Sequence, residues 1–489
     1  MPSKDKADVS ISTSTSTTTL PTELTILTLN CWGLLHISSD RKQRLEEIGR
    51  QIGSAAEAHI VCLQECWVEA DFEAIRQSTR QLLPHARLFR SGVLGSGLAI
   101  LSRWPLEDSS MVRFPLNGRP TAFWRGDWYV GKGVACAVLR LGPRHLIHVL
   151  NTHKTHAPYA TTNHSHHSSY ACHRIAQAWH MSKLLRTATS TGNLVLAVGD
   201  FNMLPLSLPH RIITSRAPVN DAWRVLHPNS SLGPSAAQPP GALFNLEENG
   251  VTSDSIYNTW RWTKNARNSL RAGRPAAPID PNAPDPRGKR LDYVFVSDTK
   301  PWAVADAAVV LTEPHPELGV SLSDHFAVRV TLRQQHQQQH YSTRSSADDK
   351  DDHEDADDDD DDNNNNNNDK VENDLLHLSK ADCDEILSLI DTYTARERVQ
   401  RRCRALHFCA ALVVWAACLV AAWFSPRDLV CFLIVLVASL VLAAGIVDGI
   451  LALFFFTSEL QSLDEFAWEV RNARSVVASP PKQASNADL

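Results

Sequence analysis

Residues 194–202 (Leu-Val-Leu-Ala-Val-Gly-Asp-Phe-Asn) restrict the fold most, because an apolar run there stops abruptly at Asp200 and Asn202. Five consecutive aliphatic residues bounded by a glycine predict a buried strand. Open α/β sheets place their chemistry at the carboxyl ends of such strands. In extended backbone, side chains two apart point to the same side, so both polar groups could address one phosphate or bound water. Taken alone, the pattern is equally typical of a strand that ends in an Asp-Asn turn.

Other predicted strands repeat this arrangement. Their polar residues are Asn30 after residues 25–30, Gln64 and Glu65 after 60–63, Asn151 and His153 after 145–150, and Asp324 and His325 before the last strand. A carboxylate at Glu65 near the Asn30 amide suits a hard cation such as Mg²⁺, which needs few protein oxygens and keeps positions for water and phosphate. Glu65 on its own is more typical of a solvated loop acid.

An Asp-His pair immediately before a strand suits a general base, because a buried carboxylate holds the imidazole in one tautomer. Asp324 is adjacent to His325 in sequence. Asp292 lies near the start of the alternating strand over residues 290–296 and is the better orienting candidate if that strand lies alongside.

A glycine-rich loop over residues 126–133 carries Asp127 and Lys132, five positions apart. By physical chemistry alone, such a pair is usually a surface salt bridge. The histidines at positions 164, 166, 167 and 173 follow in a Ser/Thr/Asn-rich stretch without tight ligand spacing, so we interpret them as a solvated loop and not a metal cluster. Residues 205–290 are predicted to form a large insertion with irregular loops, which typically carry specificity.

The formal net charge is -6, but charge is distributed unevenly along the chain. Residues 23–333 carry 33 Lys+Arg and 25 Asp+Glu, so 33 - 25 gives +8, which suits an anionic substrate or surface without requiring nucleic acid. We predict a disordered leader over 1–22, one catalytic domain over 23–333 and an acidic linker over 334–378. Ten cysteines without paired spacing predict free thiols in a reducing compartment.

The C-terminal part predicts membrane insertion. A helix over 379–404 with five arginines near its end precedes two apolar stretches, 406–424 and 429–456, each long enough to cross a bilayer. Only four residues separate them, which predicts a helical hairpin followed by a tail over 457–489. Arginines on both flanks place those flanks in the cytoplasm. Asp448 within the second stretch is an exception that could mark a helix contact.

The ordered strand-end motifs around Asn30, Glu65, Asn151 and His153, residues 199–202 and residues 323–325 resemble the endonuclease/exonuclease/phosphatase superfamily. That resemblance implies a four-layered α/β sandwich of two packed mixed sheets flanked by helices, acting on phosphate esters with Mg²⁺. Residues 29–33 (Leu-Asn-Cys-Trp-Gly), Asn151-Thr152-His153 followed by Tyr159, and the Asp127/Lys132 loop resemble neutral sphingomyelinases and fungal inositol phosphosphingolipid phospholipases C.

The resemblance also implies roles for individual residues. Glu65 is the principal Mg²⁺ ligand with Asn30 and Asp324 nearby, and His325, oriented by Asp292, takes a proton from the attacking water. Asp200 positions that water, while Asn202 and His153 stabilise the phosphoryl oxygens. Asp127 and Lys132 form a switch controlled by anionic phospholipid.

The function we expect is a Mg²⁺-dependent, membrane-tethered phospholipase C acting on sphingolipids, with its catalytic domain in the cytoplasm. The organelle is left open among the endoplasmic reticulum, the mitochondrion and the plasma membrane. A phosphoinositide phosphatase or a nuclease of the same fold is the alternative, and the hairpin with the mild basicity disfavours nucleic acid as a partner. A catalytically inactive membrane adaptor is a third class, disfavoured by the complete set of catalytic residues.

Overall fold

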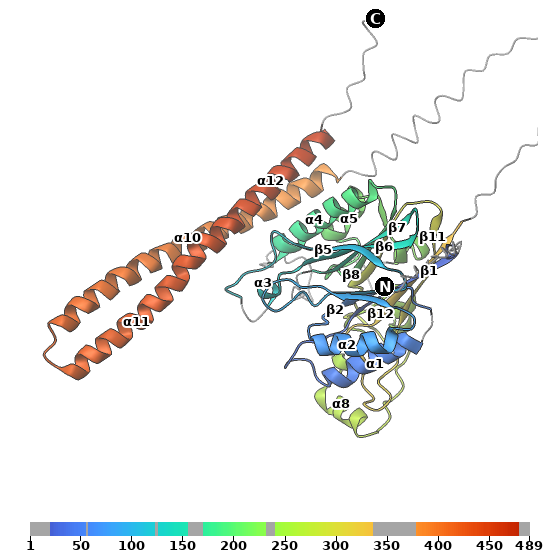
Figure 1. The fold of residues 1–489 in the computed structure, drawn as a ribbon, viewed down its shortest axis with the longest axis horizontal. Helices are drawn as coiled ribbons and strands as arrows, with labels where there is room; N and C mark the ends of the chain where they lie inside the picture. Colours follow the sequence, from blue (N-terminus) through green and yellow to red (C-terminus); the bar gives the residue numbers. More distant parts are fainter. Residues whose placement is uncertain are drawn as a thin grey trace, which may run out of the picture.

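The computed structural model describes residues 20–54, 57–122, 126–154, 170–230, 240–335 and 378–478 (Figure 1). The predicted leader over 1–22 and linker over 334–378 lie almost entirely outside these residues, as do the histidines at positions 164, 166 and 167. Those predictions therefore stay predictions. His173, by contrast, is helical and fully buried, so its assignment to a solvated loop was wrong.

The first of two six-stranded sheets has the strand order β11-β12-β1-β2-β4-β3. Its strands are β1 (Glu23–Asn30), β2 (Ile60–Gln64), β3 (His85–Leu88), β4 (Ala99–Ser102), β11 (Trp302–Val310) and β12 (Ala327–Gln334). β1 and β2 are parallel, and their register pairs Asn30 with Gln64. Both strands are mainly apolar and almost fully buried, as expected for strands covered on both faces.

The second sheet has the order β5-β6-β7-β8-β10-β9. Its strands are β5 (Leu106–Arg113), β6 (Gly133–Gly142), β7 (His145–His153), β8 (Leu194–Asp200), β9 (Val219–Asp221) and β10 (Asp292–Ser297). β7 and β8 are parallel, with His153 opposite Asp200. The antiparallel partner β10 begins at Asp292, directly across from Asp200.

Helices cover the outer faces of the two sheets. A core of apolar side chains fills the space between the sheets, and two further cores lie outside them. α1 (Arg41–Ser54) and α2 (Glu69–Thr79) pack on the first sheet, and α4 (Ala171–Thr189) and α5 (Leu208–Arg216) pack on the second (Figure 1). This arrangement confirms the predicted four-layered sandwich of two mixed sheets.

The parallel pairs β1/β2 and β7/β8 end at one edge of the sandwich, which we call the carboxyl edge. A hydrogen bond of 3.1 Å from the Asn30 amide at the end of β1 to Asp200 at the end of β8 joins the two sheets there. Antiparallel neighbours that start at this edge, such as β4, β6, β10 and β12, bring the loops before them to the same place.

The segment between β8 and β10 contains more regular structure than predicted. It forms β9 and five short helices: α5, α6 (Ala222–Leu226), α7 (Ala242–Glu247), the 3₁₀ turn η2 (Thr259–Arg261) and α8 (Lys264–Arg271). α6, η2 and α8 each begin with a residue whose side chain accepts a backbone N–H, a local capping signal that apolar periodicity does not detect.

The C-terminal helices are longer than the predicted segments. α10 (Lys380–Trp423) runs without interruption through the predicted juxtamembrane helix and the first apolar stretch. A tight turn leads to α11 (Asp428–Ile450), a π-helical turn η3 (Leu451–Phe455) and α12 (Phe456–Ala478), so most of the predicted tail is helical. Two of these helical stretches are long and apolar enough to cross a membrane, and few of their most apolar residues are buried in the protein.

α10 and α12 pack against α4 and α5 and extend the core outside the second sheet. Buried apolar residues from both helices belong to that core, among them Ile386, Ile390, Leu463 and Val470. Polar contacts surround it, including Trp179 Nε1 to Glu469 at 2.6 Å and Arg211 to Asp382 at 2.6 Å. The helical hairpin is therefore fixed to the catalytic domain by a shared core.

Val470→Ala should destabilise the protein more than Val476→Ala. Val470 is fully buried in the shared core, whereas Val476 on the same helix is 59% exposed. The substitution removes two buried carbon atoms and leaves a cavity, which together lower the free energy of unfolding by about 2 kcal/mol. Thermal unfolding in detergent should show a lower midpoint for Val470→Ala only; equal midpoints for the two variants would contradict the docking of α12.

Candidate active site

Polar side chains from four strand ends meet at the carboxyl edge. Besides its bond to Asp200, the Asn30 amide donates to Glu65 Oε1 at 3.2 Å. His153 Nε2 lies 3.5 Å from Asp200 Oδ2 and 3.8 Å from Glu65 Oε1. The structure thus brings together Asn30, Glu65, His153 and Asp200 as the sequence motifs predicted.

Glu65 is presented by an unusual backbone conformation. Its φ of 54° lies in the left-handed region, which few non-glycine residues adopt. The N–H of Gly33 donates to the Glu65 carbonyl at 3.0 Å. A Cβ at position 33 would lie 2.4 Å from that carbonyl oxygen, so only glycine permits this approach. The Asn30-Cys31-Trp32-Gly33 motif therefore positions both Asn30 and Glu65.

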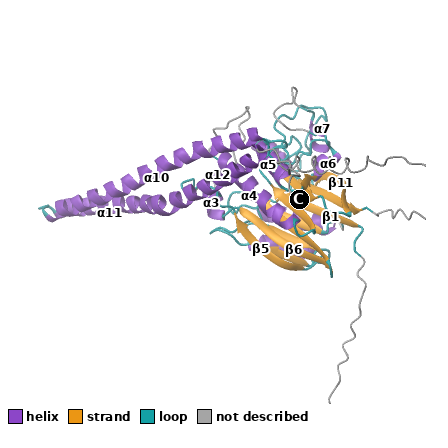
Figure 2. Cartoon of the chain, turned by 90° about the horizontal axis from the view of Figure 1, so that it is seen from above, coloured by secondary structure: helices purple, strands orange, loops and turns teal. Residues whose placement is uncertain are grey.

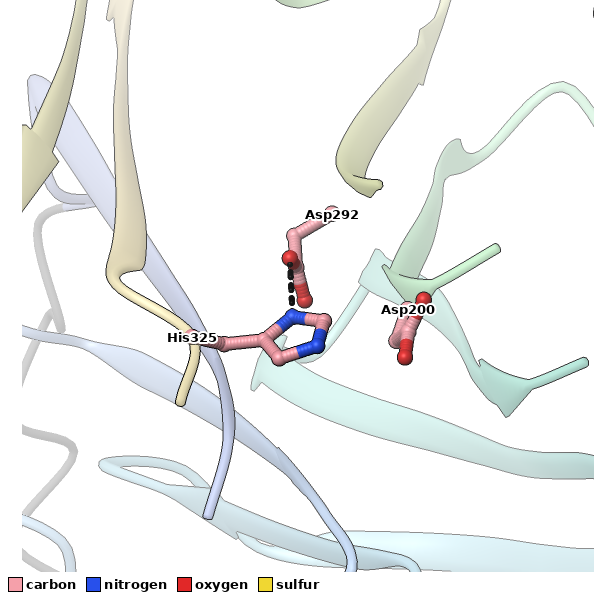
Figure 3. A group of neighbouring side chains, drawn as sticks. All are labelled: Asp200, Asp292 and His325. Atoms are coloured by element: carbon pink, nitrogen blue, oxygen red, sulfur yellow. Dashed lines mark hydrogen bonds and ion pairs between the residues drawn. The ribbon is translucent and has the colours of Figure 1, made fainter. Parts of the chain in front are cut away.

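His325 pairs with Asp292 and not with its sequence neighbour. Nδ1 of His325 lies 2.8 Å from Asp292 Oδ2, as expected from the start of β10. Figure 3 shows Asp292 at one ring nitrogen of His325 and Asp200 beside the other. The Ser323 hydroxyl donates to the Asn30 carbonyl at 2.6 Å and holds this loop against the end of β1.

Burial makes the electrostatics of these carboxyl groups unusual. Burial raises the pKa of Asp200 to about 7, and the charge of Asp292 adds to the increase. Burial, and then the charge of Asp324, also raise the pKa of Glu65. Burial on its own lowers the pKa of His325, but the nearby carboxylates, led by Asp292, outweigh it and hold that pKa well above its ordinary value.

The oxygen-rich end of the site fits a hard divalent cation. Oε2 of Glu65 is buried and accepts no hydrogen bond from any described residue. Such an orphaned carboxylate oxygen, next to the amide of Asn30 and near the carboxyl group of Asp324, matches the oxygen donors that Mg²⁺ prefers. Asp200, Asp292 and His325 also bring ligand atoms within 4.8 Å of one another. The residues present therefore agree with a magnesium requirement.

Asn202 does not follow the extended geometry expected for it. β8 ends at Asp200, and Asn202 has a φ of 47°. Its amide donates to Asp200 Oδ2 and to the Lys154 carbonyl, both at 3.2 Å. Asn202 therefore fixes Asp200 through a turn, which local apolar patterning does not reveal.

The Asp127/Lys132 pair is buried, so its interpretation as a surface salt bridge was wrong. The side chains are 4% and 5% exposed and lie 3.5 Å apart. Asp127 begins the short helix α3 (Asp127–Val130), and Lys132 Nζ donates to the Lys154 carbonyl at 3.2 Å. Lys132 thus contacts the backbone immediately after His153, at the end of β7.

Arg44 is a residue that sequence reasoning missed. It is fully buried and donates to the backbone carbonyls of Cys31, Trp32 and Leu322, the loops that carry Asn30 and His325. Arg44 lies four residues before Ile48, on the apolar face of α1, and this position could have indicated that its side chain is buried. Gln64 was noted only as a polar neighbour, yet it links the two sheets through a 2.8 Å bond to Asn151.

A cavity of about 480 Å³ opens beside His325 and Asp324. Cationic side chains dominate its lining: Arg261, Arg267, Arg287 and Lys289, with Asp254 among them. Lys289 and Arg287 contact Asp254 at 2.7 and 3.2 Å. Trp32 and Trp260 form an aromatic wall with ring centroids 4.7 Å apart. Most of these residues come from the region before β10, where no motif predicted them.

Proteins of similar sequence identify the family to which the chain belongs. Residues 27–325 match the profile of the Endonuclease/Exonuclease/phosphatase family. The chain belongs to this family. It is 36% identical to an inositol phosphosphingolipids phospholipase C from Schizosaccharomyces pombe, over 92% of this chain and 94% of that protein. The human sphingomyelin phosphodiesterase 2 is 30% identical over 64% of this chain and 65% of its own length.

Among solved structures, sphingomyelinase C from Streptomyces griseocarneus is similar. It shares 17% identity with a TM-score of 0.40, covering 63% of this chain and 99% of that one. The sequence relatives therefore assign the chain, within the family, to the inositol phosphosphingolipid phospholipases C and neutral sphingomyelinases.

Mg²⁺ affinity should weaken markedly between pH 8 and pH 6. A carboxyl group with a raised pKa keeps its proton to a higher pH, and a cation binds the carboxylate form. Asp200, which titrates near 7, shares the Asn30 amide with the expected ligand Glu65, so the proton it gains between pH 8 and pH 6 removes a negative charge beside the cation site and should weaken binding by up to about tenfold. Titration calorimetry at the two pH values measures this. A site of ordinary carboxylates would bind equally at both, and that result would contradict the electrostatics described here.

Proposed function

We propose that the protein is a Mg²⁺-dependent phospholipase C that hydrolyses sphingolipid phosphodiesters to ceramide and a phosphorylated headgroup. The observation that carries this proposal is the buried Asp292–His325 pair, which lies beside Asp200, Asn30 and Glu65 at one sheet edge. The activities named for the relatives from Schizosaccharomyces pombe and human support the substrate class.

His325 acts as the general base. In the neutral imidazole, Asp292 accepts the hydrogen bond from Nδ1–H and Nε2 can take a proton from water. Because the nearby carboxylates raise the pKa of His325, this neutral form becomes populated only at higher pH than for an ordinary histidine. Asp200, beside that nitrogen, positions the water for attack on phosphorus (Figure 3). As the bond between the water oxygen and phosphorus forms, the bond between phosphorus and the ceramide oxygen breaks on the opposite side, and that oxygen takes a proton from solvent water to leave as the alcohol.

The other residues bind the phosphoryl group or supply the positive charge that faces it. Glu65, with Asn30 and Asp324, would hold Mg²⁺, which when bound neutralises charge on the phosphoryl oxygens. His153 donates to those oxygens as charge develops on them. Asn202 contributes by fixing Asp200, and Lys132 supplies positive potential near the end of β7.

The membrane attachment follows from the C-terminal helices. We propose that α10 and α11 cross the bilayer as a hairpin and that the catalytic domain is cytoplasmic, because exposed arginines such as Arg398, Arg401 and Arg402 flank the first span. Those arginines would attract anionic phospholipid. Anionic phospholipid is the expected activator, and the Asp127/Lys132 pair is the expected responding element.

The cavity beside His325 supports an inositol phosphate headgroup over choline phosphate. Recognition of a quaternary ammonium uses free aromatic faces. Here the Trp260 ring already has the guanidinium groups of Arg44 and Arg267 at 5.4 Å and that of Arg271 at 5.8 Å. The remaining lining offers many N–H donors and the Asp254 carboxylate, which match the hydroxyls of a polyol. The positive charges of Arg261, Arg287 and Lys289 disfavour a quaternary ammonium there.

Glu65→Gln should abolish Mg²⁺-dependent release of headgroup phosphate from sphingolipid in mixed micelles. The amide retains the shape of the side chain but removes the charge that would hold the cation, and loss of metal-supplied stabilisation costs at least about 100-fold. Glu69→Gln, four residues later on the exposed start of α2, is the control and should retain activity. If wild-type protein released phosphate from phosphoinositides or cleaved plasmid DNA but released nothing from sphingolipids, the proposed function would be wrong.

Lys289→Ala should lower kcat/KM for inositol phosphosphingolipid about tenfold, because a hydrogen bond from a charged donor contributes about 1.5–3 kcal/mol. Activity on sphingomyelin should change less than about twofold. Lys264→Ala, on the exposed side of α8, is the matched control. Release of both headgroups is measured with each variant. An equal loss on both lipids would show that Lys289 has no part in headgroup selection.

A further inference from the structure

Exposed apolar side chains are concentrated on the loops of the carboxyl edge. Among the large hydrophobic residues exposed in the described part of 20–335, six lie there: Leu35, Ile37, Val93, Leu94, Trp128 and Leu206, which we call the apolar rim. The other four lie on or next to α6 and α7: Val225, Leu226, Leu243 and Phe244. Val93 is 82% exposed and Ile37 is 71% exposed, so these are protruding side chains and not the edges of a core.

The rim lies at the same sheet edge as the site, and its loops are held in place. The backbone N–H groups of Val93 and Leu94 donate to the Tyr129 carbonyl on α3 at 2.7 and 3.3 Å. The Trp128 ring packs edge-on against Tyr129 at 5.1 Å. Ile37 lines the cavity beside His325. A clustered apolar surface at the mouth of a polar site usually marks an interaction surface.

The apolar rim is continuous with the helices proposed to cross the membrane. The ring centroid of Trp128 lies 6.2 Å from that of Phe455, in the π-helical turn that follows α11. Leu453 and Phe454 in that turn are 61% and 66% exposed. In Figure 1 and Figure 2, α3 lies on the side of the catalytic domain from which the hairpin projects.

Helix length places this contact at the membrane surface. α11 has 23 residues, and at about 1.5 Å per residue it spans about 35 Å, slightly more than the hydrocarbon core of a bilayer, about 30 Å. The turn at Phe455 therefore lies at the boundary between acyl chains and headgroups. α3, which contacts it, lies at the same level, and the loop of Val93 and Leu94 is bonded to α3.

We infer that the apolar rim inserts into the phospholipid bilayer that holds the hairpin. The occupant of this surface is the lipid layer itself, since the surface continues from a membrane-spanning segment. Insertion lets the scissile phosphodiester reach His325 while the ceramide chains stay in the bilayer. Withdrawing those chains into water would be unfavourable in proportion to the apolar surface exposed. The catalytic consequence rests on the proposed function, but the contact with lipid does not.

The first test is photocrosslinking in phosphatidylcholine vesicles containing the full-length protein. Benzoylphenylalanine is placed at position 94 in the rim or at position 244 on α7, where exposure is similar. Mass spectrometry should find phosphatidylcholine adducts at position 94 and none at position 244. No adduct at position 94, or equal adducts at both, would overturn the inference whatever reaction the protein catalyses.

The second test uses hydrolysis. Val93→Glu combined with Leu94→Glu should lower the rate on long-chain sphingolipid in vesicles at least tenfold. The rate on a short-chain analogue in detergent should stay within twofold, and Leu243→Glu with Phe244→Glu should behave like wild type in both. Equal rates of the rim variant and wild type in vesicles, or equal losses in both assays, would contradict insertion. Absence of hydrolysis by wild type in both assays would instead refute the proposed function, and the crosslinking result would still decide the role of the rim.

Discussion

The hydrogen bond from the Asn30 amide to Asp200 joins strand ends that belong to different sheets, and the site depends on it. Both residues are buried, and a buried carboxyl group without partners is unfavourable, so the two sheets must meet in one register. Gln64 and Asn151 make a second buried link at 2.8 Å, one strand further along. These amides align the parallel pairs β1/β2 and β7/β8 at the carboxyl edge. Glu65, His153 and Asp200 converge there as a result.

Patterns local in sequence predicted most of the polar residues of the site, and the family resemblance of those motifs predicted the sandwich. Buried parallel strands are continuous apolar runs, so polar residues at their ends mark the carboxyl edge directly, as at Asp200 and Glu65. The pairing of His325 with Asp292 also followed, because β10 starts opposite Asp200. Contacts between distant segments could not be predicted in this way. Arg44 reaches Leu322, 278 positions away, and no spacing rule connects them.

The burial of the Asp127/Lys132 pair and the packing of α12 could not be predicted from local composition. A glycine-rich loop with two charges is typical of a surface, yet here other segments cover both side chains. Residues after 456 have an ordinary amphipathic composition, but α12 completes a core together with α4 and α10. Inside it Tyr393 donates to Glu459 at 2.7 Å, and His173 lies 3.2 Å from the same carboxylate. The orientation of the catalytic domain relative to the hairpin is thus fixed by packing.

In the proposed mechanism, water activated by His325 at the carboxyl edge attacks the phosphorus of a sphingolipid phosphodiester. Hydrolysis in ¹⁸O-labelled water, followed by mass spectrometry of both products, tests it most directly. The account predicts one ¹⁸O atom in the released headgroup phosphate and none in ceramide. A cyclic inositol phosphate without ¹⁸O as the product would show that a substrate hydroxyl, and not water, is the nucleophile, and would contradict the account.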